Sequence, residues 1–397
     1  MLMTTDRQYD PAEFTAGSPI SVQIGMVVLL LMAIGAVFVF SASANVTQDI
    51  ELHKFYEYTS LRQSLFFILA VVVMWATCRI DYRRLDMSKG LLLSPTTYLL
   101  GLSIILLIVV LIPRFGAEIN YARRWLRIPV GPAHVSFQPS ELAKWALIIF
   151  LAGLGQRYSN KLRIFSSGFV PTCLVIGLVA GLILIEDFGT AVLVFVLSFL
   201  MLIMAGVRWL HILPPLPFAA GAFIAAVLSS ESRKQRILAF LHPDRWTDSI
   251  NYQPSQSLIA LGSGGILGKG LGMGICKYGH LPEDTTDFIF SIICEELGFI
   301  GAAGVILLFI AFVWLGVIVI VRCKDPFGQL LAAGIVLTIG LQAAINIAVV
   351  TVVVPTKGIP LPFVSAGGTS LLLSAAAVGV LMNIAKQSGT DAERVGR

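Results

Sequence analysis

The sequence carries little charge for its length. Of its 397 residues only 13% are charged, whereas 56% are hydrophobic and the mean hydropathy is +0.85. A soluble domain carries about 25% charged residues, so the composition excludes an ordinary soluble protein and indicates a polytopic membrane protein. The net charge of +5 is modest, and we expect no nucleic-acid partner. Repeated apolar segments favour one continuous helical bundle over separate domains.

Cysteine and secretion signals are scarce as well. The N-terminal residues 1–20 show no signal-peptide charge pattern and no small-residue cleavage site, so the first apolar segment is expected to remain as a signal anchor. The five cysteines show no metal-type spacing, and we expect them to be buried small hydrophobic residues. They are Cys78, Cys173, Cys276, Cys294 and Cys323.

Apolar runs long enough to cross about 30 Å of hydrocarbon recur along the chain. They predict an all-α polytopic membrane protein of about ten transmembrane helices. A transmembrane domain is expected over 21–387, with cytoplasmic tails at 1–20 and 388–397 and a large extracytoplasmic loop, 229–286, between the seventh and eighth helices. The runs begin near Ile24, Leu65, Tyr98, Glu141, Phe169, Phe188, Ile212, Phe288, Leu331 and Ser370.

Lysine and arginine mark the cytoplasmic side of a membrane protein. They are frequent between the second and third, fourth and fifth, and eighth and ninth predicted helices, which places both termini in the cytoplasm. Yet the loops at 114–140 and 229–286, which then lie outside, are also basic. Either long loops cross the membrane regardless of charge, or an anionic ligand binds outside, where arginine suits phosphate geometry.

Polar side chains within the apolar segments point to function by default. Glu141 and Lys144 stand at i and i+3 and share a helix face. They form either a structural ion pair or, if they face a cavity, a site where Lys144 meets a phosphate. Gln342 and Asn346, at i and i+4, are predicted to hydrogen-bond to neighbouring helices.

The stretch "LPEDTTDFIF" (281–290) sets Glu283, Asp284 and Asp287 directly before a long apolar helix. Acids at a helix start are favoured by the helix dipole, so a cap is the simplest interpretation, and a cation site or reacting groups are the alternatives. Counting back from Arg322 at 1.5 Å per residue places residues 287–297 at or above the outer lipid boundary, wet enough for the carboxylates at 295 and 296.

Two segments rich in glycine or proline flank this region in the sequence. The run "GSGGILGKGLGMG" (262–274) lacks the Ser or Thr that follows the lysine of a phosphate-binding loop, so we expect a tight loop packed near the site. The segment "VVPTKGIPLPFVSAGGTS" (353–370) cannot face lipid and must be covered by protein or line a cavity. It places Lys357 on the outer side.

Several long motifs in order resemble the SEDS family (shape, elongation, division and sporulation), which includes FtsW, RodA and SpoVE. They are "ARRWLRIPVGPAHVSFQPSELAK", "EDFGTA", "SLIALGSGGILGKGLG", "LPEDTTDFIFSIICEELGFIG" and "PTKGIPLPFVSAGGTSL". The "PTKGIPLPF" motif looks most like the division branch, FtsW. Three positions depart from the family pattern: Thr285 stands where His is frequent, Ala366 where an aromatic is common, and Glu186 where Pro is usual.

The resemblance implies a peptidoglycan glycosyltransferase that polymerises lipid II with inversion at the donor anomeric carbon. It implies Asp287 as general base and Glu283 as its supporting acid, with a divalent cation, Mn²⁺ or Mg²⁺, held between these two carboxylates and the substrate pyrophosphate. The residues expected to bind substrate are Arg124, Lys144, Lys277, Lys357, Glu141 and Ser365.

The resemblance also implies partners and a place in the cell. We expect lipid II, a class B penicillin-binding protein that crosslinks the new strand, and other membrane proteins of the division complex as partners. The expected location is the bacterial cytoplasmic (inner) membrane, at the division septum. Two other classes remain open at this stage: a flippase that moves lipid II across the membrane, and a non-catalytic scaffold of the division machinery. A transporter with an inverted repeat is disfavoured because no such repeat is evident.

Overall fold

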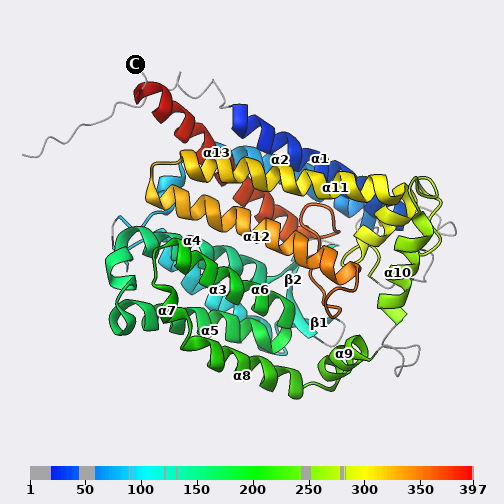
Figure 1. Ribbon diagram of the computed structural model, residues 1–397, viewed down its shortest axis with the longest axis horizontal. Coiled ribbons are helices and arrows are strands. Elements are labelled where there is room, and N and C mark those ends of the chain that lie inside the picture. Colours follow the sequence, from blue (N-terminus) through cyan, green and yellow to red (C-terminus); the bar gives the residue numbers. More distant parts are fainter. Residues whose placement is uncertain are drawn as a thin grey trace, which may run out of the picture.

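The computed structural model describes residues 19–43, 59–88, 90–91, 93–119, 122–130, 133–242, 252–277, 281 and 283–395. Most of the predicted N-terminal tail therefore lies outside the described residues. The described chain is a bundle of long helices, and each predicted apolar run falls in or directly beside one of them (Figure 1). The helices that correspond to these runs are α1 (Pro19–Ser43), α2 (Thr59–Arg79), α3 (Pro95–Leu111), α4 (Pro139–Leu162), α5 (Val170–Glu186), α6 (Phe188–Met204), α7 (Trp209–Ile212) with α8 (Pro215–Leu228), α11 (Ile289–Arg322), α12 (Pro326–Val350) and α13 (Gly368–Val395).

Seven of the described helical segments are long and apolar enough to cross a membrane, and α3 and α6 are shorter apolar helices. The helix α4 fails this criterion on composition, because it carries charged and polar residues such as Glu141 and Lys144. Its buried residues nevertheless run from Pro139 to Leu162, so it lies inside the bundle. The prediction of a helical, multi-pass membrane protein is confirmed.

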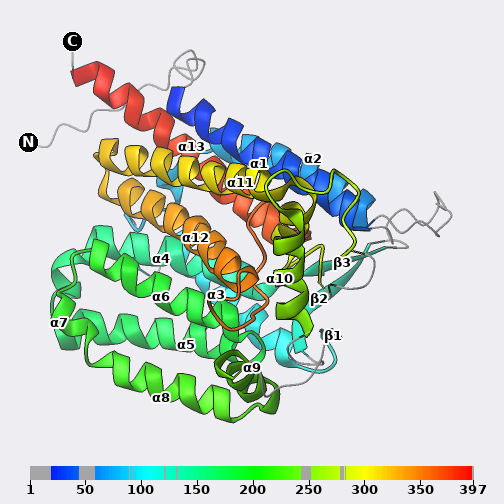
Figure 2. The same cartoon turned by 45° about the vertical axis from the view of Figure 1, so that its right-hand side comes forward.

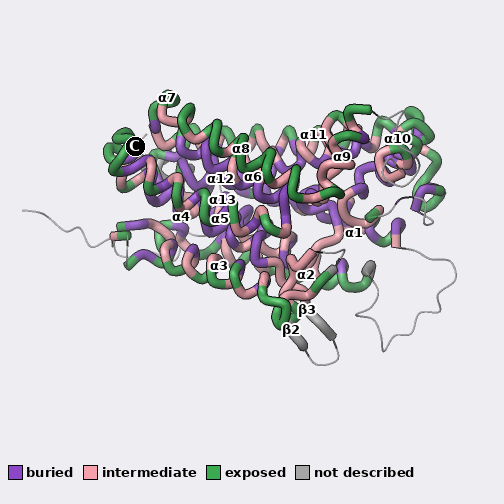
Figure 3. The backbone as a smooth tube through the Cα atoms, turned by 90° about the horizontal axis from the view of Figure 1, so that it is seen from below, coloured by how far each residue is buried: buried purple, intermediate pink, exposed green. Residues whose placement is uncertain are grey.

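The helices are arranged in two groups around α12. On one side α1, α2 and α13 lie together, and on the other α3 to α6 form a second group, as Figures 1 and 2 show. Small residues allow the close approach that packing within lipid requires: Gly334 of α12 faces Ile148 and Met201 of the second group. At the edge, α8 has no buried residue (Figure 3).

The predicted outer loop at 114–140 contains a three-stranded antiparallel sheet, which the sequence analysis did not anticipate. Its strands, in the order β1-β2-β3, are β1 (Gly116–Ile119), β2 (Ala122–Val130) and β3 (Ala133–Phe137). Leu126 of the central strand pairs with Gly116 on one side and Phe137 on the other. The sheet gives the basic residues of this loop a rigid support.

The predicted loop at 229–286 is also more regular than expected. It contains the amphipathic helix α9 (Glu231–Leu241) and the helix α10 (Tyr252–Gly264). The glycine-rich run begins in the last turn of α10 and folds against α11 at Gly298, where φ is 65° and the helix is interrupted. Lys269 and Gly270 donate their backbone N–H groups to the carbonyls of the two residues at 295 and 296, both at 3.0 Å. The run is therefore a tight loop, as predicted, and it satisfies backbone groups that the interruption leaves without helical partners.

The carboxylates of Glu295 and Glu296 are buried from solvent, contrary to the sequence-based expectation that they are accessible to water. Both side chains have 0% exposure. Glu295 accepts from Lys269 Nζ at 2.6 Å, and Glu296 accepts from Lys277 Nζ at 2.9 Å and from Ser41 Oγ at 2.8 Å. The count along the helix could not foresee that the glycine-rich loop and α1 enclose both carboxylates within the protein.

Candidate active site

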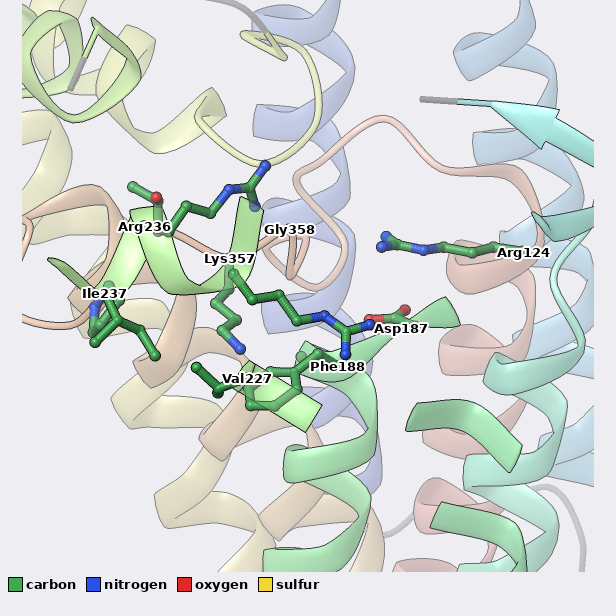
Figure 4. A pocket seen from close by; sticks show the side chains of 12 residues that line it. Arg124, Asp187, Phe188, Val227, Arg236, Ile237, Lys357 and Gly358 are labelled. Atoms are coloured by element: carbon green, nitrogen blue, oxygen red, sulfur yellow. The ribbon is translucent and has the colours of Figure 1, made fainter. Parts of the chain in front are cut away.

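A cavity lies at the end of the bundle where α5 gives way to α6 and the segment between α12 and α13 folds back. Four parts of the chain line it: β2, the start of α6, the α8–α9 region and residues 355–358. Figure 4 shows Arg124 entering the cavity from β2 and Arg236 from α9 on the other side. The lining residues are Arg124, Asp187, Phe188, Gly189, Val227, Arg233, Arg236, Ile237, Pro355, Thr356, Lys357 and Gly358.

Arg124 is oriented by the end of α5. Its Nε donates to the carbonyl oxygen of Glu186 at 2.8 Å, which leaves its terminal nitrogens for the cavity. The carboxylate of Glu186 accepts from the backbone N–H of Arg123 at 2.9 Å, so the same residue also holds the strand in place. Glu186, where the family usually has Pro, thus ties β2 to α5.

Lys357 and Arg233 surround the aromatic ring of Phe188. The Nζ of Lys357 lies 3.0 Å from the ring centroid, and the guanidinium carbon of Arg233 lies 5.4 Å from it. Burial and the positive charge of Arg233 lower the pKa of Lys357 to about 7. Lys357 therefore titrates near neutral pH.

Asp187 lines the cavity, but its carboxylate has a structural task. It begins α6 and accepts from the backbone N–H of Thr190 at 3.1 Å and from the hydroxyl of Thr190 at 2.8 Å. Only 5% of the residue is exposed. We interpret it as a helix cap that also contributes negative charge to the site.

Asp287 lies directly beside the cavity. Its carboxylate rests on the backbone of Gly358, where an added Cβ would come within 2.8 Å of Oδ2. Burial raises the pKa of Asp287 to about 7, and the charges of Glu283 and Asp187 act in the same direction, against Arg124 and Arg236. The carboxyl group is thus poised to exchange a proton near neutral pH, as a general base requires.

The backbone around Asp287 is fixed by the segment 359–366. Ser365 Oγ donates to the carbonyl of Thr286 at 2.5 Å, and the N–H of Ala366 donates to the carbonyl of Thr285 at 2.8 Å. Ser365 Oγ also accepts from the N–H of Leu361 at 2.8 Å. Its hydroxyl therefore joins two loops in this structure; substrate binding by Ser365 stays a prediction.

Gln342 and Asn346 were predicted to hydrogen-bond to neighbouring helices, and this holds for only one of them. Gln342 does reach a neighbouring helix, because its Oε1 accepts from Lys144 Nζ of α4 at 3.0 Å, but its Nε2 donates to the carbonyl of Pro360. Among the described residues Asn346 bonds to no helix side chain, and its Nδ2 donates to the carbonyls of Asp287 and Ile359. The prediction was wrong for Asn346 because the chain that covers this end of α12 is loop rather than helix.

Four predicted substrate-binding residues do not line the cavity, and Ser365 is one of them. Glu141 and Lys144 form a buried ion pair at 2.9 Å, and Glu141 also accepts from Ser370 at 3.2 Å. Lys277 lies in the ion pair with Glu296, away from the lining residues. Phosphate binding by Lys144 and Lys277 stays a prediction, whereas Arg124 and Lys357 do meet at the cavity.

Arg233 and Arg236 were expected only as basic loop residues and not as part of the site. Their i, i+3 spacing in "ESRKQRILAF" was a usable signal, since it puts both on one face of a helix. Glu283 is exposed, has a φ of 58° and accepts from Thr286 Oγ1 at 2.8 Å. It lies close enough to Asp287 to raise the pKa of that residue.

The side chains near the cavity that could bind a divalent cation are carboxylates. Among the described residues, no group of three or more His, Cys, Asp or Glu side chains is arranged to hold a metal ion. Asp287 and Glu283 could supply two carboxylates. Mg²⁺ is typically bound by one or two carboxylates together with substrate phosphates and waters, so the pair fits a cation that arrives with a phosphate ligand.

Comparison with known proteins supplies the family. The model of the FtsW/RodA/SpoVE family, described as cell cycle proteins, matches residues 22–390. The probable peptidoglycan glycosyltransferase FtsW of Geobacter metallireducens is 39% identical over 91% of this chain and 95% of its own length. Stage V sporulation protein E of Bacillus subtilis is 37% identical over 91% and 96%.

Solved structures agree with this assignment. The crystal structure of the rod shape determining protein RodA of Thermus thermophilus gives a TM-score of 0.65 at 25% identity, covering 94% of this chain and 98% of RodA. A chain of a peptidoglycan synthase complex, studied for its coordination of polymerization and crosslinking, gives 0.71 at 26% identity, with 92% and 97% covered. The FtsW-like resemblance inferred from the motifs is confirmed, and the chain belongs to the FtsW/RodA/SpoVE family of cell cycle proteins.

Proposed function

We propose that this protein is a peptidoglycan glycosyltransferase that polymerises lipid II at the outer face of the cytoplasmic membrane during cell division. The FtsW relatives that carry the name of this activity cover nearly the whole chain. One observation carries the proposal for the site: a carboxyl group with a pKa near 7, Asp287, lies beside a cavity lined by four basic side chains. This combination suits deprotonation of a hydroxyl next to a bound pyrophosphate.

In the proposed reaction Asp287 takes the proton from the C4 hydroxyl of the acceptor sugar. The oxygen attacks the anomeric carbon of the donor, a new C–O bond forms with inversion, and the bond to the lipid pyrophosphate breaks. General-base assistance contributes about 10²–10⁴ in rate, and it is most effective when the pKa of the base lies near the operating pH. Glu283 supports the base, because its negative charge helps to keep the pKa of Asp287 raised.

The departing pyrophosphate accumulates negative charge as the bond breaks. Arg124, Arg233, Arg236 and Lys357 converge on the cavity and would stabilise that charge. Arginine can donate two parallel hydrogen bonds to a phosphate, which fixes its orientation as well as its charge. Because pyrophosphate is a good leaving group, we propose that these basic side chains stabilise its departure by their charge and that no residue acts as a general acid.

A divalent cation, Mn²⁺ or Mg²⁺, is part of the proposal. Asp287 and Glu283 would hold it together with pyrophosphate oxygens, and when bound it would supply additional charge stabilisation.

We further propose that the protein works with a class B penicillin-binding protein and other membrane proteins of the division complex, at the septum, with both termini in the cytoplasm. The structural similarity to a chain from a synthase complex that couples polymerization to crosslinking supports a crosslinking partner. The abundance of Lys and Arg in the connections between helices on one side supports the orientation.

A polymerisation assay with matched variants tests the proposal. The purified protein and its transpeptidase are given labelled lipid II and Mn²⁺ or Mg²⁺, and glycan strands are resolved on a gel. We expect strands from the wild type and from Asp284→Asn, which changes a neighbouring acid, and none from Asp287→Ala or Asp287→Asn. Strands from the Asp287 variants would remove the general base from the mechanism. Transport of lipid II in liposomes without strand formation would favour a flippase, and partner binding without either activity would favour a scaffold.

A further inference from the structure

The side chain of Asn346 holds two loops together at the site. It lies on α12 with 0% exposure, and its Nδ2 donates to the carbonyl of Asp287 at 2.8 Å and to that of Ile359 at 2.7 Å. Its Oδ1 has no hydrogen-bond partner within the described part of the chain. Rotation of the amide would bring this oxygen against two carbonyl oxygens, so both hydrogen bonds fix the amide in one orientation.

The two residues joined by Asn346 belong to segments that meet at the reacting carboxylate. Ile359 follows Gly358, on whose backbone Oδ2 of Asp287 rests, and Lys357 precedes it. The contact has no spare room, because a Cβ at Gly358 would lie 2.8 Å from Oδ2. The separation between the Asp287 and Ile359 carbonyls therefore sets where the carboxylate lies relative to the lysine side of the cavity.

The helix that carries Asn346 is itself well anchored. One turn earlier, Gln342 donates to the carbonyl of Pro360 at 3.0 Å and accepts from Lys144 Nζ, which is paired with Glu141. The amides at 342 and 346 thus bind successive carbonyls of one loop, 360 and 359. Through them the ion pair of α4 supports the loop that lies against the carboxylate.

We propose that Asn346 is a positioning residue for catalysis, which clamps the segment bearing Asp287 to the segment bearing Lys357. Asn346 touches neither the substrate nor the reacting atoms and acts through the backbone of its two neighbours. This proposal rests on the proposed general-base function of Asp287. It also gives the buried pair of Glu141 and Lys144 a task that requires no contact with phosphate.

The test compares four variants of the full chain, assayed with its transpeptidase and lipid II. Asn346→Ala removes the clamp, and Gly358→Ala displaces the same carboxylate from the other side without removing a hydrogen bond. Asp287→Asn reports on the general base. The matched control is Asn383→Ala, because Asn383 is a buried amide of α13 that bonds to Cys78 and Tyr82 and is not among the residues that line the cavity.

A clamp predicts a specific pattern of kinetics and stability. We expect Asn346→Ala and Gly358→Ala each to lower kcat on the order of 10²-fold, as misplacement of a reacting group by about 1 Å does, with KM within about twofold of wild type. Asn383→Ala should lower the thermal unfolding temperature in detergent and leave kcat per folded molecule unchanged.

Two results would overturn the proposal in distinguishable ways. If Asp287→Asn is inactive while Gly358→Ala and folded Asn346→Ala keep the wild-type kcat, the clamp has no role and the general base stands. If Asp287→Asn polymerises lipid II, the general-base function fails and the clamp fails with it. Because Gly358→Ala leaves the buried amide intact, an unchanged kcat in this variant would overturn the premise that the position of the carboxylate controls the rate, even where Asn346→Ala does not fold.

Discussion

Replacing Lys357 with arginine should abolish the alkaline limb of the pH–rate profile and leave the acidic limb in place. The pKa of Lys357 is lowered to about 7 by burial and by Arg233, whereas that of Asp287 is raised to about 7 by burial and by Glu283. The proposed reaction needs an ionised Asp287 and a protonated Lys357. Activity is therefore lost below pH 7 as the carboxylate takes up a proton, and above pH 7 as the ammonium loses one. Arginine stays protonated throughout this range.

The expected change of kcat/KM with pH follows from the pKa values of Asp287 and Lys357. The profile of kcat/KM reports the pKa values of the free enzyme. With both near 7 and independent, about a quarter of molecules carry the active combination at pH 7 and about one in a hundred at pH 5 or pH 9. For the wild type, kcat/KM at pH 9 should thus be about one twenty-fifth of the wild-type value at pH 7. For Lys357→Arg, kcat/KM at pH 9 should be about twice the value of the same variant at pH 7.

The assay measures initial rates of strand formation from labelled lipid II between pH 5 and pH 9, at constant ionic strength. Lys357→Met serves as the control, because it carries no charge at any pH and should show a low kcat/KM without an alkaline limb. An alkaline fall of the wild-type size in Lys357→Arg would refute the assignment of that limb to Lys357.

Three further predictions concern charge, cation and stability. Arg236→Ala should raise KM for lipid II by roughly tenfold and weaken its dependence on salt, measured over a range of ionic strength; an unchanged KM would remove Arg236 from the pyrophosphate site. Saturating Mn²⁺ should move the acidic limb below pH 7, because a cation beside Asp287 lowers the pKa of that residue, and an unmoved limb would argue against the cation site. Lys277→Met should destabilise the fold by about 3–5 kcal/mol, because it leaves Glu296 buried without this partner. Lys234→Met, in an exposed pair, should cost less than about 1 kcal/mol in detergent unfolding, and equal losses in the two variants would contradict this reasoning.

The sequence predicted those features that depend on local composition. Transmembrane helices follow from the length of apolar runs, and the tight glycine-rich loop follows from residue types that tolerate unusual backbone angles. The sheet at 114–140 was missed because its central strand, "ARRWLRIPV", shows no clean alternation of apolar and polar residues. Its backbone hydrogen bonds instead pair it with β1 on one side and β3 on the other.

The site was predictable only in part, because long-range contacts decide it. The motif singled out Asp287, but the positions of the cavity-lining residues Arg233 and Arg236 depend on how α9 docks, which the spacing within a helix cannot specify. For Lys144 the sequence left an ion pair and a phosphate site open. The ammonium group of Lys144 also donates to Gln342 Oε1, and Gln342 lies 198 residues away in the chain.

The interruption of α11 at Gly298 divides this helix into a short and a long segment. From residue 299 to Arg322 the helix rises about 36 Å at 1.5 Å per residue, which already exceeds the roughly 30 Å of hydrocarbon. The preceding short segment, 289–297, would then hold the proposed base, Asp287, at the level of the lipid headgroups. A polyprenyl-linked sugar presents its pyrophosphate at that depth while its tail stays in lipid. In the proposed reaction, donor and growing strand would then react in turn without either leaving the bilayer.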